Sequence, residues 1–480
     1  MAKQFLFNSG DGAAISVWNI VAWQFLIFRS GEHELAPSGG TLSTSVPATA
    51  TQGMVGTPSG SNTQVGWASG ILGFAQIFAA VIASAAADSQ RLQRKFVVRT
   101  GCVFGFIAIV VSLCATFLGI HHGGQGVTWF YGACVLWGYY RGFTYPATEA
   151  IFTGSVPKKF RTEVFSLKWS VVNISFFLGY LVNIILYLIE GNHWADDVVQ
   201  IVVVAGLGLQ ALVIIPAAMV RDEDELPELK EEPTKSTRTS TRSLVGQEDQ
   251  QAIKALLTNG GTTAASIQVS EVDPKQDEEE ETERSCLCFS PRWLPYLVAS
   301  EQVISVLGSG MTVRFFPLFF IHLGVSPIAF NLAALLTTIL TSLFSVSLQR
   351  LARSWIGRGW AILFSQTCGM GALYFLCFCD VHAVSLPLLL AVWIFRYAAM
   401  NCQRGIARSI IMDNVPANQR TRWNAVESVC SFSWAASAVV GGYIIDSHGY
   451  QFGFLVTAGI QTVATLLFLP VAALTFREWV

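Results

Sequence analysis

The chain alternates long apolar segments with short charged or turn-rich ones, and this alternation constrains its fold more than any other feature. A helix needs roughly 20 apolar residues to cross the hydrocarbon core of a bilayer. About twelve segments meet that requirement, at residues 4–28, 66–87, 96–119, 128–151, 164–188, 197–219, 293–321, 328–349, 359–379, 385–407, 424–445 and 451–475. Only 13% of the residues are charged, against about 25% in soluble domains. We therefore predict an all-α integral membrane protein with twelve transmembrane helices.

The distribution of Lys and Arg orients these helices. Basic residues occupy the short loops on one side of the predicted membrane, namely Arg91, Arg94, Lys95, Arg99, Lys158, Lys159, Arg161, Arg350, Arg353, Arg358, Arg420 and Arg422. The loops on the other side hold only Arg29. Because short cytoplasmic loops are enriched in Lys and Arg, we expect the basic side and both termini to be cytoplasmic. This topology fits the plasma membrane and an endomembrane equally.

The histidines follow the opposite distribution. All seven fall in loops predicted to be non-cytoplasmic: His33, His121, His122, His193, His322, His382 and His448. They are either sensors of pH or metal that face an acidic lumen, since imidazole titrates near neutrality, or neutral side chains tolerated where Lys and Arg are excluded. No pair has the spacing of metal ligands on a helix. We therefore predict no metal site and no cofactor.

A charged segment divides the chain into two halves. Residues 221–291 include RDEDELPELKEEPTK and DEEEETER, a composition that cannot bury a core and that is typical of disorder. We predict a cytoplasmic linker here, accessible to cytosolic regulators, between an N-terminal six-helix bundle at 1–220 and a C-terminal six-helix bundle at 292–480. Both halves contain a related phrase between their fourth and fifth spans, VPKKFRT at 156–162 and VPANQRT at 415–421. The halves are therefore predicted to be pseudo-symmetric repeats.

Two stretches around this phrase resemble the major facilitator superfamily. YPATEAIFTGSVPKKFR at 145–161 is similar to the family's fourth span and the loop after it. SIIMDNVPANQRTR at 409–422 is similar to the same stretch of the second half and keeps an acid as Asp413. The resemblance covers essentially all of the chain except the linker. It implies the major facilitator fold, with two six-helix bundles and a substrate site between them.

A third stretch, AADSQRLQRK at 86–95, resembles the signature loop of the same superfamily. Asp88 stands in the position of its acid, and Arg91, Arg94 and Lys95 stand in the positions of its bases. In the second-half copy, Arg353 takes the place of the acid. The resemblance implies that this loop latches the two halves in one conformation.

Two arginines lie near mid-depth in the predicted spans. Arg141 in the fourth span and Arg396 in the tenth occupy roughly equivalent places in the two repeats. A charge there costs about 2.5–3.5 kcal/mol on insertion scales, so it usually faces a cavity and has a partner. Two guanidiniums that face one cavity favour an anionic or carboxylate-bearing cargo, whereas the alternative is that each pairs with a carboxylate and joins helices. Further candidates for substrate binding are Asn19, Arg314, Asn401 and Gln403.

The carboxylates within the spans are candidates for coupling and gating. Asp11 in the first span and Glu301 in the seventh are the candidates for proton coupling, because a buried carboxyl can exchange a proton with each side in turn. Glu149 and Glu427 lie near the cytoplasmic ends of their spans, where a gate or a salt bridge is expected. The other gate or latch candidates are Arg404, Arg408, Asp413 and Arg420.

These features predict a secondary transporter of a small organic solute that works by alternating access. Proton coupling is a hypothesis, and an anionic cargo is favoured. The alternatives are an uncoupled uniporter and a transporter-like receptor or scaffold that does not translocate. An ATP-driven pump is disfavoured because no GxxxxGK[ST] loop is present, and an enzyme because no His lies within a span. The net charge of −2 gives no support for nucleic-acid binding, and we expect a monomer in the lipid bilayer.

Overall fold

The computed structural model describes residues 11, 14–15, 22–35, 61–88, 94–118, 126–154, 161–219, 293–415 and 420–475, and the regular elements among them are helices. Before the linker these are α2 (Ala22–Leu35), α3 (Ser61–Asp88), α4 (Arg94–Leu118), α5 (Gly126–Gly154), α6 (Arg161–Glu190) and α7 (Asp196–Ala218). After it come α11 (Leu294–Val313), α12 (Phe316–His322), α13 (Pro327–Leu351), the π-helix η4 (Ala352–Ile356), α14 (Gly357–Phe378), α15 (Leu386–Asn401), α16 (Arg404–Asp413), α17 (Arg420–His448) and α18 (Tyr450–Thr475). Each predicted span from 66–87 onward coincides with one helix or a pair of helices, which confirms the all-α prediction.

Proline and capping residues set several of these helix starts. Pro occupies the first turn of α11, α12, α13 and α15, where its missing N–H costs nothing because that group has no partner within the helix. Ser326 precedes α13, and its hydroxyl accepts a hydrogen bond from Ala329 N at 3.4 Å. Pro317 also accounts for the interruption between α11 and α12, because proline does not continue a preceding helix.

The structure corrects the span prediction at three places. The first helix continues to Leu35, beyond the predicted end at residue 28. The seventh and tenth spans are each broken into two helices, and the second part of the tenth runs on to Asp413. His33, His322 and His448 are helical rather than in loops, because a helix extends past the apolar residues that mark the hydrocarbon core. His193 and His382 do lie between helices, while His121 and His122 fall outside the described residues.

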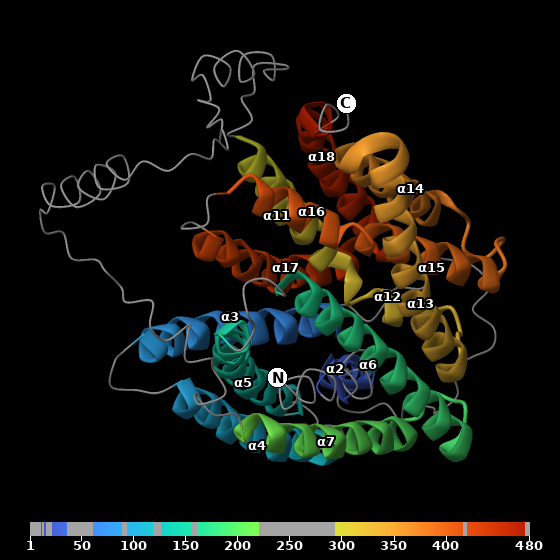
Figure 1. Ribbon diagram of the computed structural model, residues 1–480. Coiled ribbons are helices and arrows are strands. Elements are labelled where there is room, and N and C mark those ends of the chain that lie inside the picture. The colour runs from blue at the N-terminus through green and yellow to red at the C-terminus, as the bar shows by residue number, and fades with distance from the viewer. Residues whose placement is uncertain are drawn as a thin grey trace, which may run out of the picture.

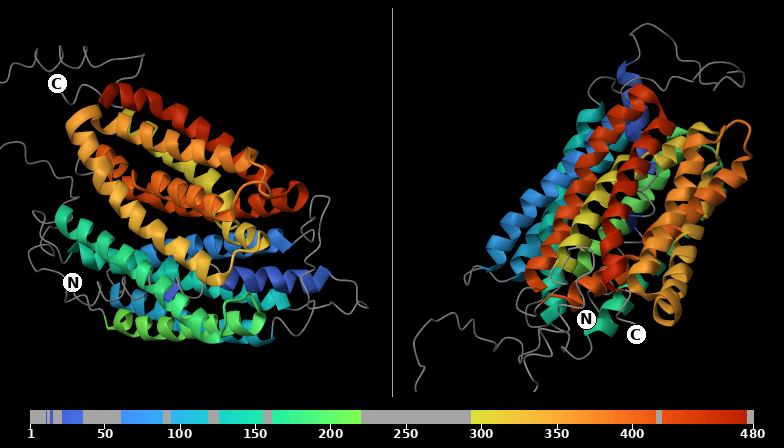
Figure 2. Two further views of the ribbon diagram at one scale, coloured as in Figure 1. Left: turned by 90° about the vertical axis from the view of Figure 1, so that its right-hand side faces the viewer. Right: turned by 90° about the horizontal axis from the view of Figure 1, so that it is seen from above.

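The helices form two groups (Figure 1). In the first group, α3 and α4 pack against α5, α4 packs against α7, and α2 contacts α3, α5 and α7. In the second group, α11 packs against α17 and α18, and α14 against α15 and α18. The two further views in Figure 2 show the same two groups side by side. The domain boundaries at residues 220 and 292 stay a prediction, because residues 220–292 lie outside the described part.

Two pairs of helices join the groups. The α3–α17 pair makes the most extensive contact between them, and α6 packs against α13. The chain crosses from one end of the bundle to the other with each successive span. The start of α3, the end of α6, the start of α13 and the end of α17 therefore share one end, which we call the Asn62 end. The sequence predicts that this end is non-cytoplasmic.

The described helices include seven stretches long and apolar enough to cross a bilayer. They are Asn62–Ala83, Lys95–Leu118, Asp196–Ala218, Leu294–His322, Pro327–Phe378, Val429–His448 and Tyr450–Thr475. Large side chains such as Phe74, Leu188 and Phe378 are more than 60% exposed on the outside of the bundle. Exposed apolar surface of this extent requires lipid around it.

Candidate functional site

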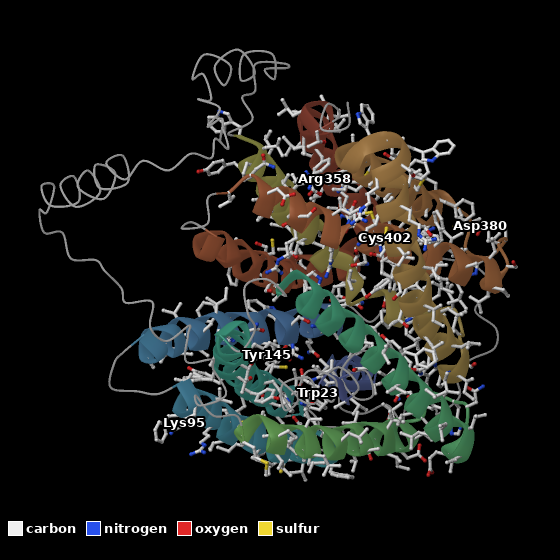
Figure 3. The ribbon with its side chains drawn as sticks, in the orientation of Figure 1. Trp23, Lys95, Tyr145, Arg358, Asp380 and Cys402 are labelled. Atoms are coloured by element: carbon white, nitrogen blue, oxygen red, sulfur yellow. The ribbon has the colours of Figure 1, made fainter. Side chains whose placement is uncertain are left out.

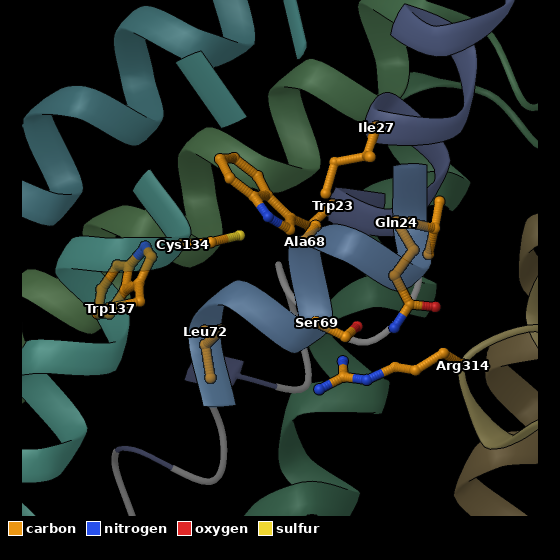
Figure 4. A pocket seen from close by; sticks show the side chains of 10 residues that line it. Trp23, Gln24, Ile27, Ala68, Ser69, Leu72, Cys134, Trp137 and Arg314 are labelled. Atoms are coloured by element: carbon orange, nitrogen blue, oxygen red, sulfur yellow. The ribbon is translucent and has the colours of Figure 1, made fainter. Parts of the chain in front are cut away.

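A pocket lies where the two helix groups meet. It encloses about 360 Å³ of space. The lining residues are Trp23, Gln24 and Ile27 of α2, Val65, Ala68, Ser69 and Leu72 of α3, Cys134 and Trp137 of α5, and Arg314 of the second group. Figure 4 shows the Arg314 side chain extending toward Ser69 and Gln24. The pocket is thus built from both groups.

The aromatic walls of this pocket are fixed by their neighbours. The ring of Trp23 packs edge-on against Phe130, with centroids 4.9 Å apart. Trp137 donates a hydrogen bond from Nε1 to Ser112 Oγ at 2.9 Å, and its ring lies edge-on to Tyr140. Rings held in this way offer flat apolar contact area to a bound molecule.

Three polar side chains also face the pocket. Gln24 is 4% exposed, and its Oε1 accepts no hydrogen bond from the described residues. Leaving a buried acceptor unpaired costs about 1–3 kcal/mol, so this oxygen is suited to a donor on a ligand. Arg314 follows the last residue of α11, and its guanidinium lies 4.5 Å from the ring centre of Trp434. With the hydroxyl of Ser69, the pocket offers an acceptor, a cation and a hydroxyl between aromatic walls.

A second cation lies close to the first. Arg141 of α5 is within electrostatic range of Arg314. Two like charges in a medium of low dielectric repel each other strongly, so a bound anion would stabilise this region. Asp11 is also within range of Arg141 and offsets part of its charge. The structure therefore brings together two of the predicted arginines and one predicted carboxylate.

Asp11 is held by three donors from α5 and α7. It is 6% exposed. Gln210 Nε2 donates to Oδ1 at 2.6 Å, Tyr140 Oη donates to Oδ1 at 3.5 Å, and Tyr145 Oη donates to Oδ2. Figure 3 shows Tyr145 between the helices of the first group. Charge-assisted hydrogen bonds of this kind orient a carboxylate and compensate its burial.

The second group contains a counterpart of this arrangement. Asp11 is the centre of a Gly-Asp-Gly triplet, and Ser309 is the centre of a Gly-Ser-Gly triplet in the equivalent span. Gln461 Nε2 of α18 donates to Ser309 Oγ at 2.8 Å. In each half, therefore, a glutamine on the sixth helix binds the central residue of the triplet on the first. The difference is that only the N-terminal half has an ionisable group there.

Glu301 lies apart from the pocket. It is 3% exposed, and Gln366 Nε2 of α14 donates to its Oε1 at 2.8 Å. This bond joins α11 to α14 within the second group. The proton-coupling role predicted for Glu301 stays a prediction, but its carboxylate does not line the pocket.

Arg396 is buried in an aromatic cluster of the second group. It is 4% exposed, and its guanidinium lies 4.9 Å from the ring centre of Phe316. Its Nε has no hydrogen-bond acceptor among the described residues. In the register set by Val156 and Val415, Arg396 corresponds to Trp137, a pocket residue, rather than to Arg141. The predicted match between the two arginines is therefore shifted by one helical turn.

The remaining substrate-binding candidates lie away from the pocket or outside the described part. Asn401 donates from Nδ2 to Tyr397 O at 2.8 Å within α15. Gln403 is 8% exposed in the interruption between α15 and α16, and its Oε1 accepts no hydrogen bond from the described residues. Asn19 lies outside the described residues.

One of the predicted latch residues forms a salt bridge. Arg358 Nη1 lies 2.5 Å from Asp413 Oδ2 and 3.5 Å from Ser409 Oγ. This pair joins the start of α14 to the end of α16, so it acts within the second group. Arg404 and Arg408 are exposed on α16, and Lys95 Nζ lies 5.7 Å from the ring centre of Phe96. The side chains of the other candidates lie outside the described part: Asp88, Arg91, Arg94, Glu149, Arg420 and Glu427.

Hydrogen bonds cross between the groups at the Asn62 end. Asn183 Nδ2 of α6 donates to Asn331 Oδ1 of α13 at 3.0 Å. Nearby, Trp194 Nε1 donates to Val325 O at 2.7 Å, and Ile328 N donates to Asn192 Oδ1 at 3.0 Å. A further set joins α3 to α17 through Asn62, Thr63, Asp446 and Tyr450. The structure thus has this end closed.

The sequence missed several of these residues. Gln24, Ser69 and Gln210 are neutral polar residues within apolar spans, and Asp446 lies at the end of one. The signal available was the shared glutamine on the sixth helix of each half, paired with the Gly-Asp-Gly and Gly-Ser-Gly triplets.

Comparison with known proteins identifies similar structures. Residues 37–269 match the family model described as Major Facilitator Superfamily. A D-xylose-proton symporter superposes with a TM-score of 0.62 at 13% identity, covering 98% of this chain and 97% of that chain. The xylose transporter XylE from E. coli in an inward open conformation gives 0.60 at 13% identity, covering 97% and 94%. The nucleoside transporter NupG gives 0.55 at 11% identity, covering 98% and 99%. No curated protein sequence matches the chain.

Proposed function

Because this chain belongs to the major facilitator superfamily, we propose that it is a secondary transporter that moves a small organic solute by alternating access. It is a multi-pass integral membrane protein. The observation that carries the proposal is the pocket between the two helix groups, in which Arg314 of one group faces Gln24 and Ser69 of the other. A solute bound there contacts both groups, so its binding energy changes when the groups move relative to each other.

The proposed cargo carries an anionic group, such as a carboxylate. Arg314 lines the pocket and Arg141 lies within electrostatic range of it. Arg396 supports the same proposal, because it is buried without a carboxylate partner among the described residues. Stacking of a guanidinium on an aromatic ring contributes about 2 kcal/mol when both are desolvated, which is less than the several kcal/mol that burial of an ion costs. An anion that reaches Arg396 during transport supplies the missing compensation.

Asp11 is the proposed proton-coupling residue. It is buried, it touches Gln210 and Tyr145, and it lies within range of Arg141, a proposed cargo ligand. A carboxyl in this position changes the charge next to the cargo each time it gains or loses a proton. One structural relative is named as a proton symporter, which is consistent with this role. Glu301 is a weaker candidate because its contact leads to α14.

The cytoplasmic gate is proposed from the sequence resemblance. Asp88, Arg91, Arg94 and Lys95 would form its latch, and Glu149, Arg420 and Glu427 are proposed to meet them when that end closes. The Asn62 end is closed in this structure, so alternating access requires that the opposite end opens in the same state. The relative in an inward open conformation has that arrangement.

The experiment that tests the proposal is a ligand screen followed by a flux measurement. The purified full-length protein is heated with a panel of carboxylates, phosphates, neutral sugars and nucleosides, at an acidic and a neutral pH. A ligand at about 100 times its dissociation constant stabilises the folded state by roughly 2.7 kcal/mol. We expect hits among the anionic compounds, and uptake of the same compounds by proteoliposomes. Binding without uptake would support a receptor, and hits confined to neutral solutes would contradict the anionic cargo.

A further inference from the structure

Asp446 of the second group caps the first turn of α3 in the first group. Its Oδ1 accepts hydrogen bonds from Asn62 N at 3.1 Å and from Asn62 Nδ2 at 2.9 Å, and its Oδ2 accepts one from Thr63 N at 2.7 Å. Tyr450 Oη adds a bond to Asn62 Oδ1 at 3.1 Å. A carboxylate near the C-terminal end of α17 is thus bound to two backbone N–H groups at the start of α3.

The position of these N–H groups explains why the contact matters. The first four N–H groups of a helix have no partner within the helix, so they need an acceptor from elsewhere. A negative charge at this end is also favoured by the partial positive charge of the helix dipole. The capping residue normally comes from the same chain segment. Here Asp446 comes from the other helix group, so separation of the groups leaves α3 without it.

The surfaces around Asp446 allow this close approach. Gly442 lies one helical turn before Asp446 on the same face of α17, and a Cβ there would be 2.5 Å from Asn62 O. On α3, a Cβ at Gly66 would be 2.5 Å from Ala438 O. Small residues at such positions let two helices pack with their backbones close together. The stripe ends at Asp446, where packing contacts give way to the charged cap.

We propose that Asp446 and the start of α3 form a conformational latch that holds the Asn62 end closed. In this structure the latch is engaged. When the two groups rotate to open this end, the start of α17 approaches no substitute donor for Asp446, and the N–H groups of Asn62 and Thr63 must be solvated. The latch therefore lowers the population of the state that is open at this end. The inference concerns the conformational equilibrium and does not depend on the identity of the cargo.

The test measures the distance between the two groups at this end. Spin labels are placed at His193 and His382, which are exposed between helices of the first and the second group, by incorporation of a noncanonical amino acid into the full-length chain. Pulsed electron paramagnetic resonance in nanodiscs then gives the ratio of open to closed populations. We expect Asp446→Ala to raise this ratio roughly 5- to 30-fold, the range that loss of a helix cap produces. We expect Asp446→Asn, which keeps one acceptor oxygen, to raise it less.

Two controls make the test specific. Asp197→Ala removes an acid from the first turn of its own helix α7 at the same end, so it should leave the ratio unchanged. Tyr450→Phe removes only the bond to Asn62 Oδ1 and should produce a small shift in the same direction as Asp446→Ala. If Asp446→Ala does not fold, Asp446→Asn and Tyr450→Phe decide the outcome. Distance distributions that are identical to wild type in all latch variants, or a shift in Asp197→Ala as large as in Asp446→Ala, would overturn the proposal.

Discussion

Two buried ionisable residues, Asp11 and Arg396, have very different surroundings. Asp11 receives three hydrogen bonds and lies within range of a cation. Arg396 has an aromatic ring beneath it and an Nε without an acceptor in the described part. A fully compensated charge supports the folded state, whereas an incompletely compensated one costs free energy unless a ligand completes it. Of the two, Arg396 is therefore the residue whose function depends more on a bound anion.

We expect Arg396→Ala to abolish transport of an anionic cargo while the protein still folds. Removal of one partner from a buried charge pair costs about 2–5 kcal/mol of binding, which corresponds to more than a tenfold loss of affinity. We expect the same for Arg141→Ala. Uptake by proteoliposomes and ligand-dependent thermal shifts measure both effects. Arg353→Ala, at an exposed position in η4, is the matched control, and normal uptake in both interior variants would contradict the anionic cargo.

Asp11→Ser is expected to uncouple transport from protons without loss of the fold. Ser309 occupies the counterpart position in the second group and binds its glutamine through a hydroxyl, so a serine at position 11 can still accept the bond from Gln210. What is lost is the ionisable group. Cargo flux that follows an imposed pH gradient in wild type should become indifferent to that gradient in the variant. A variant that remains proton-driven would assign coupling to another residue, and Glu301→Gln would then be measured in the same assay.

Charged residues were predictable at this scale and neutral ones were not. Arg141, Arg314 and Asp11 stand out in a sequence because a charge within a span is costly and therefore rare. Gln24 and Ser69 cost much less, and neutral polar residues occur in spans for many structural reasons. Their place in the pocket follows from the way α2 and α3 meet α5, which is a property of tertiary packing.

At the scale of whole elements, α3 and α17 define the contact between the groups. The face of α17 that meets α3 contains small residues, including Ala435, Ala438 and Gly442. The opposing face of α3 contains Gly66 and Gly70. Without a hydrophobic driving force between helices in lipid, close packing of small residues is the main source of attraction. The closed state of the Asn62 end therefore depends on side-chain volume along this stripe.

Gly442→Ala should open the Asn62 end. The new methyl group would be 2.5 Å from Asn62 O and 2.9 Å from Asn62 C, and both atoms belong to the backbone. Overpacking of this kind typically costs about 1–3 kcal/mol, and the cost applies only when the groups are in contact. The distance measurement between His193 and His382 should therefore show a larger open population. Gly459→Ala is the control, because a Cβ there meets no atom within 4 Å.

The salt bridge between α14 and α16 should have a small and local effect. Arg358 and Asp413 are 29% and 59% exposed, and exposed ion pairs contribute about 0.2–1 kcal/mol. We expect Asp413→Asn to lower the free energy of unfolding by no more than this amount. Because both residues belong to the second group, the populations at the Asn62 end should stay as in wild type. A marked change in those populations would instead support the latch role predicted from the sequence.

The sequence predicted the helices better than their interruptions. Apolar length and the position of charged loops were enough to locate the spans from 66–87 onward, because lipid requires a continuous apolar helix. The interruption that separates α11 from α12 follows Val313 and precedes Pro317, in a segment with no loss of hydrophobicity. A hydrophobicity count does not register it. That interruption nevertheless places Arg314 in the pocket, so the feature most important for the site was the least visible one.

At the scale of the whole molecule, the repeat organises both the fold and the chemistry. Each half uses a glutamine of its sixth helix to bind the central residue of a glycine-flanked triplet. The two halves differ at the functional positions, with Asp11 opposite Ser309 and Trp137 opposite Arg396. The cargo would thus meet an aromatic wall and an acid in one half and a cation in the other. The sequence predicted the repeat from VPKKFRT and VPANQRT, but the paired contacts required the structure.

This organisation predicts that the two halves assemble as separate chains. Residues 1–220 and 292–480, expressed together without the linker, should copurify and restore uptake, because α3–α17 and α6–α13 provide the contacts between them. A tag on one half and detection of the other measures assembly, and proteoliposome flux measures function. The matched control is a first half with Gly66→Leu, whose side chain would meet the backbone at Ala438. Assembly that tolerates this change would indicate nonspecific association, and the absence of assembly with intact halves would show that the linker contributes more than a connection.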